Sequence, residues 1–270
     1  MNRRAVAEDE TEQPTARRVY SVPAAEKVLD ILEFMADRAE PLTATEIATQ
    51  MGRSVYEIYR VLLLLEARGY LYQRAVSDGY RMTLRLFDLA HRLPSVRRLS
   101  DSALEEMQDL APRTLQSCHL GVLNGHELLI VLQVDSPLPM RYSTVLGAKF
   151  DFAETSAGTV IFAHLPPAQQ DRMLVRMAAE GRDGAEIAQV RDRAAAIRAT
   201  GHEMRESLAV TGVTNIAVPI FDHQGMVAAA MTVPYIPQRA ATVAVQAVRD
   251  MALVAARRIS ANLGAQGATP

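Results

Sequence analysis

The sequence has a single cysteine and no tryptophan. Cys118 has no partner for an intrachain disulfide, which argues against a small secreted scaffold held by cross-links. No apolar run is long enough to cross a bilayer, and the first residues lack the apolar segment of a secretion signal. We therefore expect a cytoplasmic protein with no membrane partner. The sequence also lacks a glycine-rich phosphate loop and a metal-ligand spacing of His or Cys, so we expect no cofactor and no metal.

Net charge is nearly absent, at a formal value of -2 over 270 residues, but the charges are unevenly distributed. Between residues 53 and 98 there are nine arginines and only four acidic residues, whereas the chain from Leu99 onward is mildly acidic. A basic segment joined to an acidic one is typical of a DNA-binding domain followed by a sensor domain. The length is sufficient for two domains, each with its own core.

The segment 42–71 carries two helix starts in succession. Thr43 with Glu46 and Ser54 with Glu57 each fit a capping box, in which the hydroxyl and the carboxylate bond each other's backbone amides. We predict helices over 44–51 and 55–67, separated by Gly52, which can adopt a left-handed backbone without steric cost. A short helix, a tight turn and a longer helix make a helix-turn-helix, whose second helix enters the DNA major groove.

The neighbouring segments predict a winged version of this motif. A helix is expected over 21–36, and two β-prone runs, 70–74 and 80–83, flank a turn at 77–79. Such a hairpin can rest on the phosphate backbone. A linker helix follows, ending at Pro94. On the second helix of the pair, helical periodicity separates a core face from an outward face that carries Tyr56, Tyr59, Arg60 and Leu63.

The second half of the chain alternates helical and β-prone patterns. We predict a helix capped by Ser100 or Asp101, a hairpin with an Asn-Gly turn at residues 124–125, and a strand over 140–146. Further helices are expected over 155–164, from 166, over 191–199 and over 238–262, with strands over 214–221 and 226–235. Helices flanking a largely antiparallel sheet give the α+β class.

A series of short motifs resembles the IclR family of bacterial transcription regulators: SVPAAEKVLDIL from Ser21, LTATEIA from Leu42, LEARGYL from Leu65, SPLP from Ser136, SAG from Ser156 and GVTNIAVPIFD from Gly212. The resemblance extends from about Tyr20 to Asn262. It implies homodimers, often paired into tetramers, on palindromic double-stranded operator DNA. The resemblance also implies a winged helix-turn-helix over 19–83, a linker helix over 84–98 and a GAF-like effector-binding domain over 99–263. The polar ends of the chain add a disordered tail over 1–18 and a second tail over 264–270.

The start of the recognition helix departs from the family pattern. Relatives usually have a Lys-Ser-Thr type sequence where this chain has Val55, Tyr56 and Glu57, so a basic group is replaced by an aromatic ring and an acid. The operator sequence therefore cannot be transferred from relatives. We predict DNA contact by the residues of the two helix starts, the outward helix face and the wing: Thr43, Arg53, Ser54, Tyr56, Glu57, Tyr59, Arg60, Arg74 and Arg81.

The resemblance also implies an effector pocket in the second domain, lined by Tyr142, Phe150, Ser156, Ala157, Gly158, Arg205, Val213, Asn215, Thr232 and Pro234. Helix amides at 156–158 suit a carboxylate. Arg205 stands where some relatives have an acidic residue, which favours a small anionic, carboxylate-like effector. Tyr142 and Phe150 leave room for an aromatic or apolar body.

Two alternatives compete with a ligand-responsive regulator. In the first, Cys118 or a histidine such as His119 makes the second domain an enzyme. Because adjacent strand residues point to opposite faces, Cys118 and His119 cannot form a catalytic couple by themselves, and a small buried thiol is favoured. In the second alternative, the helix-turn-helix contacts protein, which the loss of the basic helix start would explain. We expect a regulator and not an enzyme.

Overall fold

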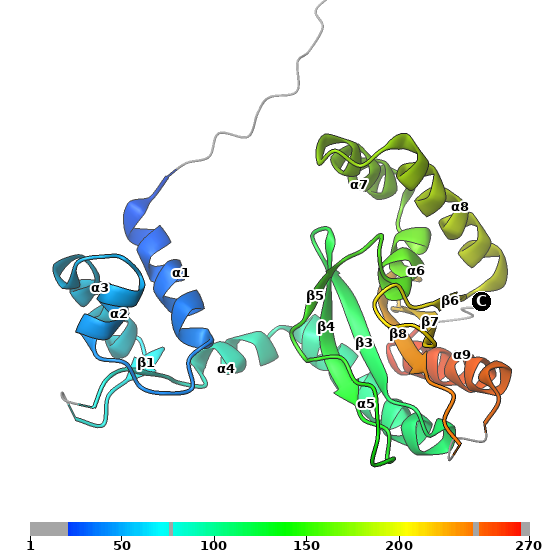
Figure 1. The fold of residues 1–270 in the computed structure, drawn as a ribbon, viewed down its shortest axis with the longest axis horizontal. Coiled ribbons are helices and arrows are strands. Elements are labelled where there is room, and N and C mark those ends of the chain that lie inside the picture. The colour runs from blue at the N-terminus through cyan, green and yellow to red at the C-terminus, as the bar shows by residue number, and fades with distance from the viewer. Residues whose placement is uncertain (1–20, 76–77, 240–242, 266–270) are drawn as a thin grey trace, which may run out of the picture. The chain divides into compact units, whose positions relative to one another are not determined.

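The computed structural model describes residues 21–75, 78–239 and 243–265. The chain divides after His91 into two compact units (Figure 1). Each unit has buried hydrophobic side chains of its own. The first is helical with a small sheet, and the second is an α+β domain with a six-stranded sheet. The predicted class is therefore confirmed. In the described parts of the chain, no helix combines the length and the apolar character needed to cross a bilayer.

The first unit is built around the predicted helix pair. Its elements are α1 (Pro23–Ala36), α2 (Ala44–Gln50), α3 (Val55–Ala67), β1 (Leu71–Tyr72), β2 (Arg81–Met82) and α4 (Arg85–His91). The turn between α2 and α3 contains Gly52 with φ 64°, as predicted. The core is formed by one stripe from each of α1, α2 and α3 and by the small sheet: Ile31, Met35, Ile47, Ile58, Leu62, Leu65, Leu71 and Tyr80.

The wing is shorter than the β-prone runs suggested. Strands β1 and β2 pair antiparallel, with Leu71 opposite Met82. Tyr80 forms a bridge to Leu42, and their backbones exchange N–H···O bonds of 2.7 and 3.2 Å. The base of the wing is thus attached to the segment that precedes α2. Residues 76 and 77 of the predicted turn lie outside the described residues.

The second unit contains one antiparallel sheet in the order β5-β4-β3-β8-β7-β6. Its strands are β3 (Cys118–Asn124), β4 (Glu127–Val134), β5 (Lys149–Asp151), β6 (Glu203–Glu206), β7 (Thr214–Phe221) and β8 (Val227–Tyr235). Its helices are α5 (Pro94–Thr114), α6 (Ser156–His164), α7 (Pro167–Ala179), α8 (Gly184–Thr200) and α9 (Val245–Asn262).

The two faces of this sheet support separate apolar clusters. Helices α5 and α9 cover one face, where Met107, Ile216 and Ile259 are fully buried. Helix α6 covers the other face and packs against α8 (Figure 1). Val160 of α6 and the strand residues Ala217 and Ala230 belong to the apolar cluster on this face. Because successive strand residues point to opposite faces, neighbours such as Ile216 and Ala217 enter different clusters.

The prediction of a strand over residues 140–146 is wrong. These residues form a loop, and the edge strand β5 begins only at Lys149. The apolar side chains that suggested a strand point into solvent, and Met140 is 80% exposed. The loop is held by side chains instead, because Asp135 pairs with Arg141 at 2.8 Å and accepts a bond from Ser143 Oγ at 2.6 Å.

Several helix boundaries also differ from the predictions. Ser100 and Asp101 do not cap a helix, because α5 begins at Pro94 and runs through them. Proline is tolerated at a first helical position, where its missing N–H has no partner in any case. Helix α8 starts at Gly184 rather than Arg191, and α9 starts at Val245 rather than Gln238. The segment 84–98 holds α4 and the first turn of α5, and the functional domain limits stay a prediction.

The hairpin predicted around Asn124 and Gly125 is confirmed, with a shifted turn. Asn124 pairs with Glu127, so Gly125 and His126 form the two-residue loop between β3 and β4. Gly125 has φ 69°, a left-handed conformation that a side chain would disfavour. The turn therefore depends on one glycine rather than on the Asn-Gly pair.

Candidate functional site

Both predicted capping boxes are present at the starts of the helix pair. Thr43 N–H donates to Glu46 Oε2 at 2.8 Å, and Glu46 N–H donates to Thr43 Oγ1 at 3.3 Å. At α3, the corresponding bonds between Ser54 and Glu57 are 3.1 and 3.3 Å long. The backbone hydrogen bonds lower the pKa of both glutamates, so the carboxylates stay charged at the positive helix ends.

The outward face of α3 is mainly aromatic and apolar. Tyr56 is 81% exposed, Tyr59 is 48% exposed, and Arg60 and Leu63 lie exposed beside them, whereas Ile58 and Leu62 are fully buried. The helical pattern predicted this division. A recognition helix with this face has rings and methyl groups for contacts with base edges, and Arg60 supplies its positive charge.

Two other predicted DNA residues have partners on α1. Arg53 Nη2 lies 2.5 Å from Asp30 Oδ2, and Lys27 Nζ lies 3.4 Å from Glu57 Oε1. These pairs fix the beginning of α3 to α1, so a structural role accounts for Arg53 and Glu57 without DNA. On the wing, Arg74 and Arg81 are both exposed. Their predicted contacts with phosphates remain predictions.

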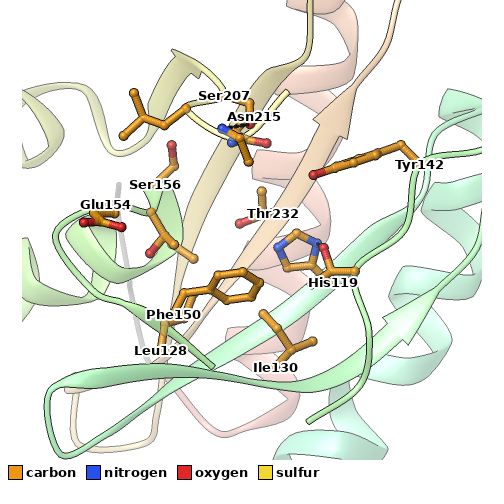
Figure 2. Close-up of a pocket in the computed structure, with 15 residues that line it drawn as sticks. His119, Leu128, Ile130, Tyr142, Phe150, Glu154, Ser156, Ser207, Asn215 and Thr232 are labelled. Atoms are coloured by element: carbon orange, nitrogen blue, oxygen red, sulfur yellow. Dashed lines mark hydrogen bonds between the residues drawn. The ribbon is translucent and has the colours of Figure 1, made fainter. Parts of the chain in front are cut away.

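The second unit contains a cavity of about 250 Å³ between the sheet, the start of α6 and two loops (Figure 2). Residues of β3, β4, β5, β7 and β8 line it from the sheet side: His119, Leu128, Ile130, Phe150, Asn215 and Thr232. The loops and α6 contribute Tyr142, Thr144, Glu154, Thr155, Ser156, Ala157, Ser207, Leu208 and Ala209. This volume is below the usual range for drug-sized ligands and suits a small metabolite.

Hydrogen-bonding groups meet apolar groups in this cavity. Figure 2 shows His119, Tyr142, Phe150 and Thr232 pointing toward one space. Burial lowers the pKa of His119 to about 4, so its ring is neutral at pH 7. The Thr232 hydroxyl is buried, and in the described structure it has no hydrogen-bond partner. A buried hydroxyl without a partner is energetically costly, and a ligand entering the cavity can remove that cost.

Six of the ten predicted effector residues line this cavity: Tyr142, Phe150, Ser156, Ala157, Asn215 and Thr232. The other four do not. Val213 is buried but does not line the cavity. Arg205 on β6 and Pro234 on β8 are the residues that pair with Asn215 of β7 on its two sides. Gly158 packs against backbone, because a Cβ on it would lie 2.3 Å from Phe152 O.

Arg205 lies beside the cavity rather than in its wall. Paired antiparallel residues point to the same face of a sheet, so Arg205 leaves β6 on the same side as Asn215. Burial and the neighbouring Arg193 charge lower its pKa. Among the described residues, Arg205 makes no ion pair within 4.0 Å. The lining itself contains no arginine or lysine, so the start of α6 is the main electropositive feature of the cavity wall.

The start of α6 is held by two arginines that sequence analysis missed. Arg193 on α8 donates to Glu203 at 2.7 and 2.9 Å, to Ala153 O at 2.6 Å and to Thr155 O at 3.2 Å. Arg182 contacts Glu154 at 3.0 Å. Thr155 is the N-cap of α6, and its hydroxyl accepts from Gly158 N–H at 3.0 Å.

His119, Glu154 and Thr155 were also missed as lining residues. The sequence did contain a signal for His119. Adjacent strand residues point to opposite faces of a sheet, so His119 lies on the face opposite the buried Cys118 thiol. Cys118 is fully buried, and its thiol lies 3.7 Å from Met107 O. Burial raises its pKa to about 12, which makes it a poor nucleophile. The interpretation as a small buried thiol is confirmed.

A winged helix-turn-helix followed by an α+β domain with a metabolite-sized cavity defines a class, the DNA-binding regulators that sense a small molecule. Two family models match the chain in this order. The IclR helix-turn-helix domain covers residues 24–75, and the bacterial transcriptional regulator IclR C-terminal domain covers residues 92–261. The chain belongs to the IclR family and is a ligand-responsive, DNA-binding transcriptional regulator.

Two curated relatives match over almost their whole length. The chain is 28% identical over 255 residues to the HTH-type transcriptional regulator KdgR of Escherichia coli, covering 90% of this chain and 94% of KdgR. It is 28% identical over 253 residues to the glycerol operon regulatory protein of Streptomyces griseus, covering 91% and 98%. The crystal structure of an IclR homologue with 4-hydroxybenzoate from Microbacterium hydrocarbonoxydans has the same fold, with 22% identity, coverage of 89% and 98%, and a TM-score of 0.73.

Proposed function

We propose that the protein binds a palindromic operator as a homodimer or tetramer, and that a small carboxylate-like metabolite in the second domain regulates this binding. The observation that carries the proposal is the pairing of an exposed recognition face on α3 with a cavity that contains an unpartnered hydroxyl. Two-fold symmetry of the protein would match the symmetry of a palindromic operator. A cytoplasmic location follows from this role, since operator DNA must be accessible.

The operator part of the proposal rests on the α3 face. Tyr56, Tyr59 and Arg60 are exposed on one side of a helix that both capping boxes and the Arg53–Asp30 pair hold in place. Arg60 has the charge and reach to bond a guanine edge or a phosphate. Exposed apolar side chains on α1 and in the turn before α4, among them Leu29 and Leu84, favour association with a second copy.

Arg60→Ala should weaken operator binding by about 1–3 kcal/mol if Arg60 contacts a base. The measurement is fluorescence anisotropy with DNA from upstream of the protein's own gene, over a range of salt concentrations. Base contact predicts relaxed sequence preference at one position, whereas phosphate contact predicts a smaller salt slope with unchanged preference. Arg191→Ala, which removes an exposed arginine of the second unit, is the matched control and should leave affinity unchanged.

Wild-type binding without salt dependence and without sequence preference would contradict operator recognition. If Arg60→Ala left DNA affinity unchanged but abolished binding to a protein partner, the helix-turn-helix would be a protein-contacting unit instead. The Cys118 thiol is buried with a raised pKa, which does not favour the alternative in which it acts as a nucleophile. We therefore place the regulatory activity in binding and not in turnover.

The carboxylate preference rests on α6 and on Arg205. Ser156 and Ala157 present the first turn of α6 to the cavity, where backbone N–H groups and the helix dipole favour an anion. Arg205 lies on the same face of the sheet, next to the wall, with its charge unpaired among the described residues. Phe150, Leu128 and Ile130 suit an apolar or aromatic body, as in the 4-hydroxybenzoate bound by the structural neighbour.

Thr232→Val should separate ligand binding from folding. Because the Thr232 hydroxyl has no partner in the described structure, its removal should leave the melting temperature of the free protein unchanged or raised. The stabilisation by a bound effector should shrink, since the ligand loses a hydrogen bond worth about 0.5–1.5 kcal/mol. A thermal-shift screen of small carboxylic acids, with 4-hydroxybenzoate among them, measures both quantities. A large loss of stability without ligand would show that the hydroxyl is already satisfied.

A further inference from the structure

A second cavity lies at the other end of α6. It has a volume of about 410 Å³, within the usual range for small-molecule sites. It is lined by the tip of the β3–β4 hairpin, the second half of α6, α7 and the start of β8. Its lining shares no residue with the cavity at the start of α6, which is the proposed effector site and is called the effector cavity below. The second cavity is lined by Leu123, Gly125, His126, Ile161, Leu165, Gln169, Arg172, Met173, Arg176, Val227 and Ala228.

One part of the wall of this second cavity is apolar. Ile161 from α6 is 3% exposed, and Leu123, Leu165, Met173 and Val227 are partly buried around it. All five belong to the apolar cluster on the α6 face of the sheet or pack against it. The cavity therefore presents the edge of a hydrophobic core to solvent, and an apolar group placed there would remove this surface from water.

The rim of the second cavity is cationic. Arg172, Arg176 and His126 line it, and no acidic residue does. Arg176 is paired, because its Nε lies 2.6 Å from Glu180 Oε1. Arg172 is exposed and makes no ion pair within 4.0 Å among the described residues. The hydrogen bond from Arg176 is the main cause that lowers the pKa of Glu180.

The second cavity combines apolar lining residues with the guanidinium of Arg172, which makes no ion pair among the described residues, and this combination indicates the kind of molecule that could bind. A neutral apolar molecule would leave Arg172 unpaired, and a compact inorganic anion would leave the wall in contact with water. A molecule with one anionic group and an apolar body satisfies both at once, since its head can pair with Arg172 while its body covers Ile161 and Met173. The effector cavity differs, because no arginine or lysine lines it.

We propose that the cavity between the β3–β4 turn, α6 and α7 is a second ligand site, which takes an amphiphilic carboxylate with Arg172 as its charge partner. The site is separate from the effector cavity, although α6 contributes to both. Ser156 and Ala157 from its first turn line the effector cavity, and Ile161, little more than one turn further on, lines the second site.

Octanoate is a suitable test ligand, because it joins one carboxylate to a flexible apolar chain. Titration calorimetry with the full-length protein should show saturable binding. Arg172→Glu should weaken this binding by about tenfold or more, because it replaces an attractive charge by a repulsive one. Arg191→Glu makes the same change of charge at an exposed position of α8 outside the cavity, and it should leave the affinity as in the wild type.

A steric variant tests the location independently of charge. Gln169 is exposed on α7 and lines the cavity, so Gln169→Trp should cover the apolar wall without entering the core, and it should abolish octanoate binding. Thr232→Val in the effector cavity should leave octanoate binding unchanged. The proposal is overturned if octanoate does not bind saturably, if Arg191→Glu weakens binding as much as Arg172→Glu, or if Thr232→Val removes it, since octanoate would then occupy the effector cavity.

Discussion

Replacing Arg193 with methionine should lower the free energy of unfolding by about 3–5 kcal/mol, because it leaves a buried carboxylate without its partner. The side chains of Arg193 and Glu203 are 13% and 10% exposed, and two N–H···O bonds join them. The same guanidinium also satisfies the carbonyls of Ala153 and Thr155. Urea denaturation followed by circular dichroism measures the loss, and the effector-induced thermal shift should disappear with it because the start of α6 is released.

Arg113→Met is the matched control for Arg193→Met. Arg113 pairs with Asp109 at 2.8 Å, nearly the same distance, but both side chains are 52% exposed. Exposed pairs one helical turn apart contribute only about 0.3–0.5 kcal/mol, so this variant should unfold almost as the wild type does. If the two variants lost similar stability, burial would not be the reason for the Arg193 effect. Glu203→Gln should be destabilising too, since it removes the compensating charge while Arg193 stays buried.

Gly158→Ala should destabilise the second unit by about 3 kcal/mol, at the upper end for overpacking a core. An added Cβ would lie 2.3 Å from Phe152 O and 2.5 Å from Phe152 Cα. These are backbone atoms, so relief requires the 152–155 segment to move away from α6. That segment carries the N-cap Thr155 and the cavity residue Glu154. Thermal unfolding with and without effector should show lower stability together with weakened ligand binding.

Two other glycines provide controls for this prediction. At Gly121 the three atoms nearest to an added Cβ all belong to the side chain of Leu128, the closest at 2.8 Å, and a side chain can change rotamer. Gly121→Ala should therefore lose less stability than Gly158→Ala. Gly184, the first residue of α8, has no atom within 4 Å of the added position, and alanine there should be neutral or stabilising. An equal loss at all three positions would contradict the steric explanation.

Local signals predicted the first unit well. Both capping boxes, the extent of α3 and its outward face are as expected. Each of these features depends only on residues three or four apart in the sequence, so a short segment is enough to predict it. Signals failed where tertiary contacts decide. Met140 and Val145 have the composition of a strand but lie exposed in a loop tied to Asp135. Ser100 and Asp101 resemble caps, yet α5 has already begun at Pro94.

In the effector cavity, too, some residues were predicted from the sequence and others were not. Resemblance to relatives located Tyr142, Ser156 and Thr232, which come from three separate elements and now line one space. It did not locate His119, or the Arg193–Glu203 pair behind the wall. Arg193 is only one of the charged residues of a polar helix, and nothing in its neighbourhood along the chain indicates burial. Glu203 and the two carbonyl partners of Arg193 are each ten or more residues away, so their meeting depends on the fold.

The separation of apolar clusters on the two faces of the six-stranded sheet has an evolutionary consequence. The α5–α9 face is closed by fully buried side chains such as Met107 and Ile259, and it has no part in the effector cavity. Alternate residues of the same strands can therefore change independently, one set keeping the domain folded while the other set is replaced. A gene lineage could pass from one effector to another through viable intermediates, because each replacement at the cavity leaves the packing of the α5–α9 face intact.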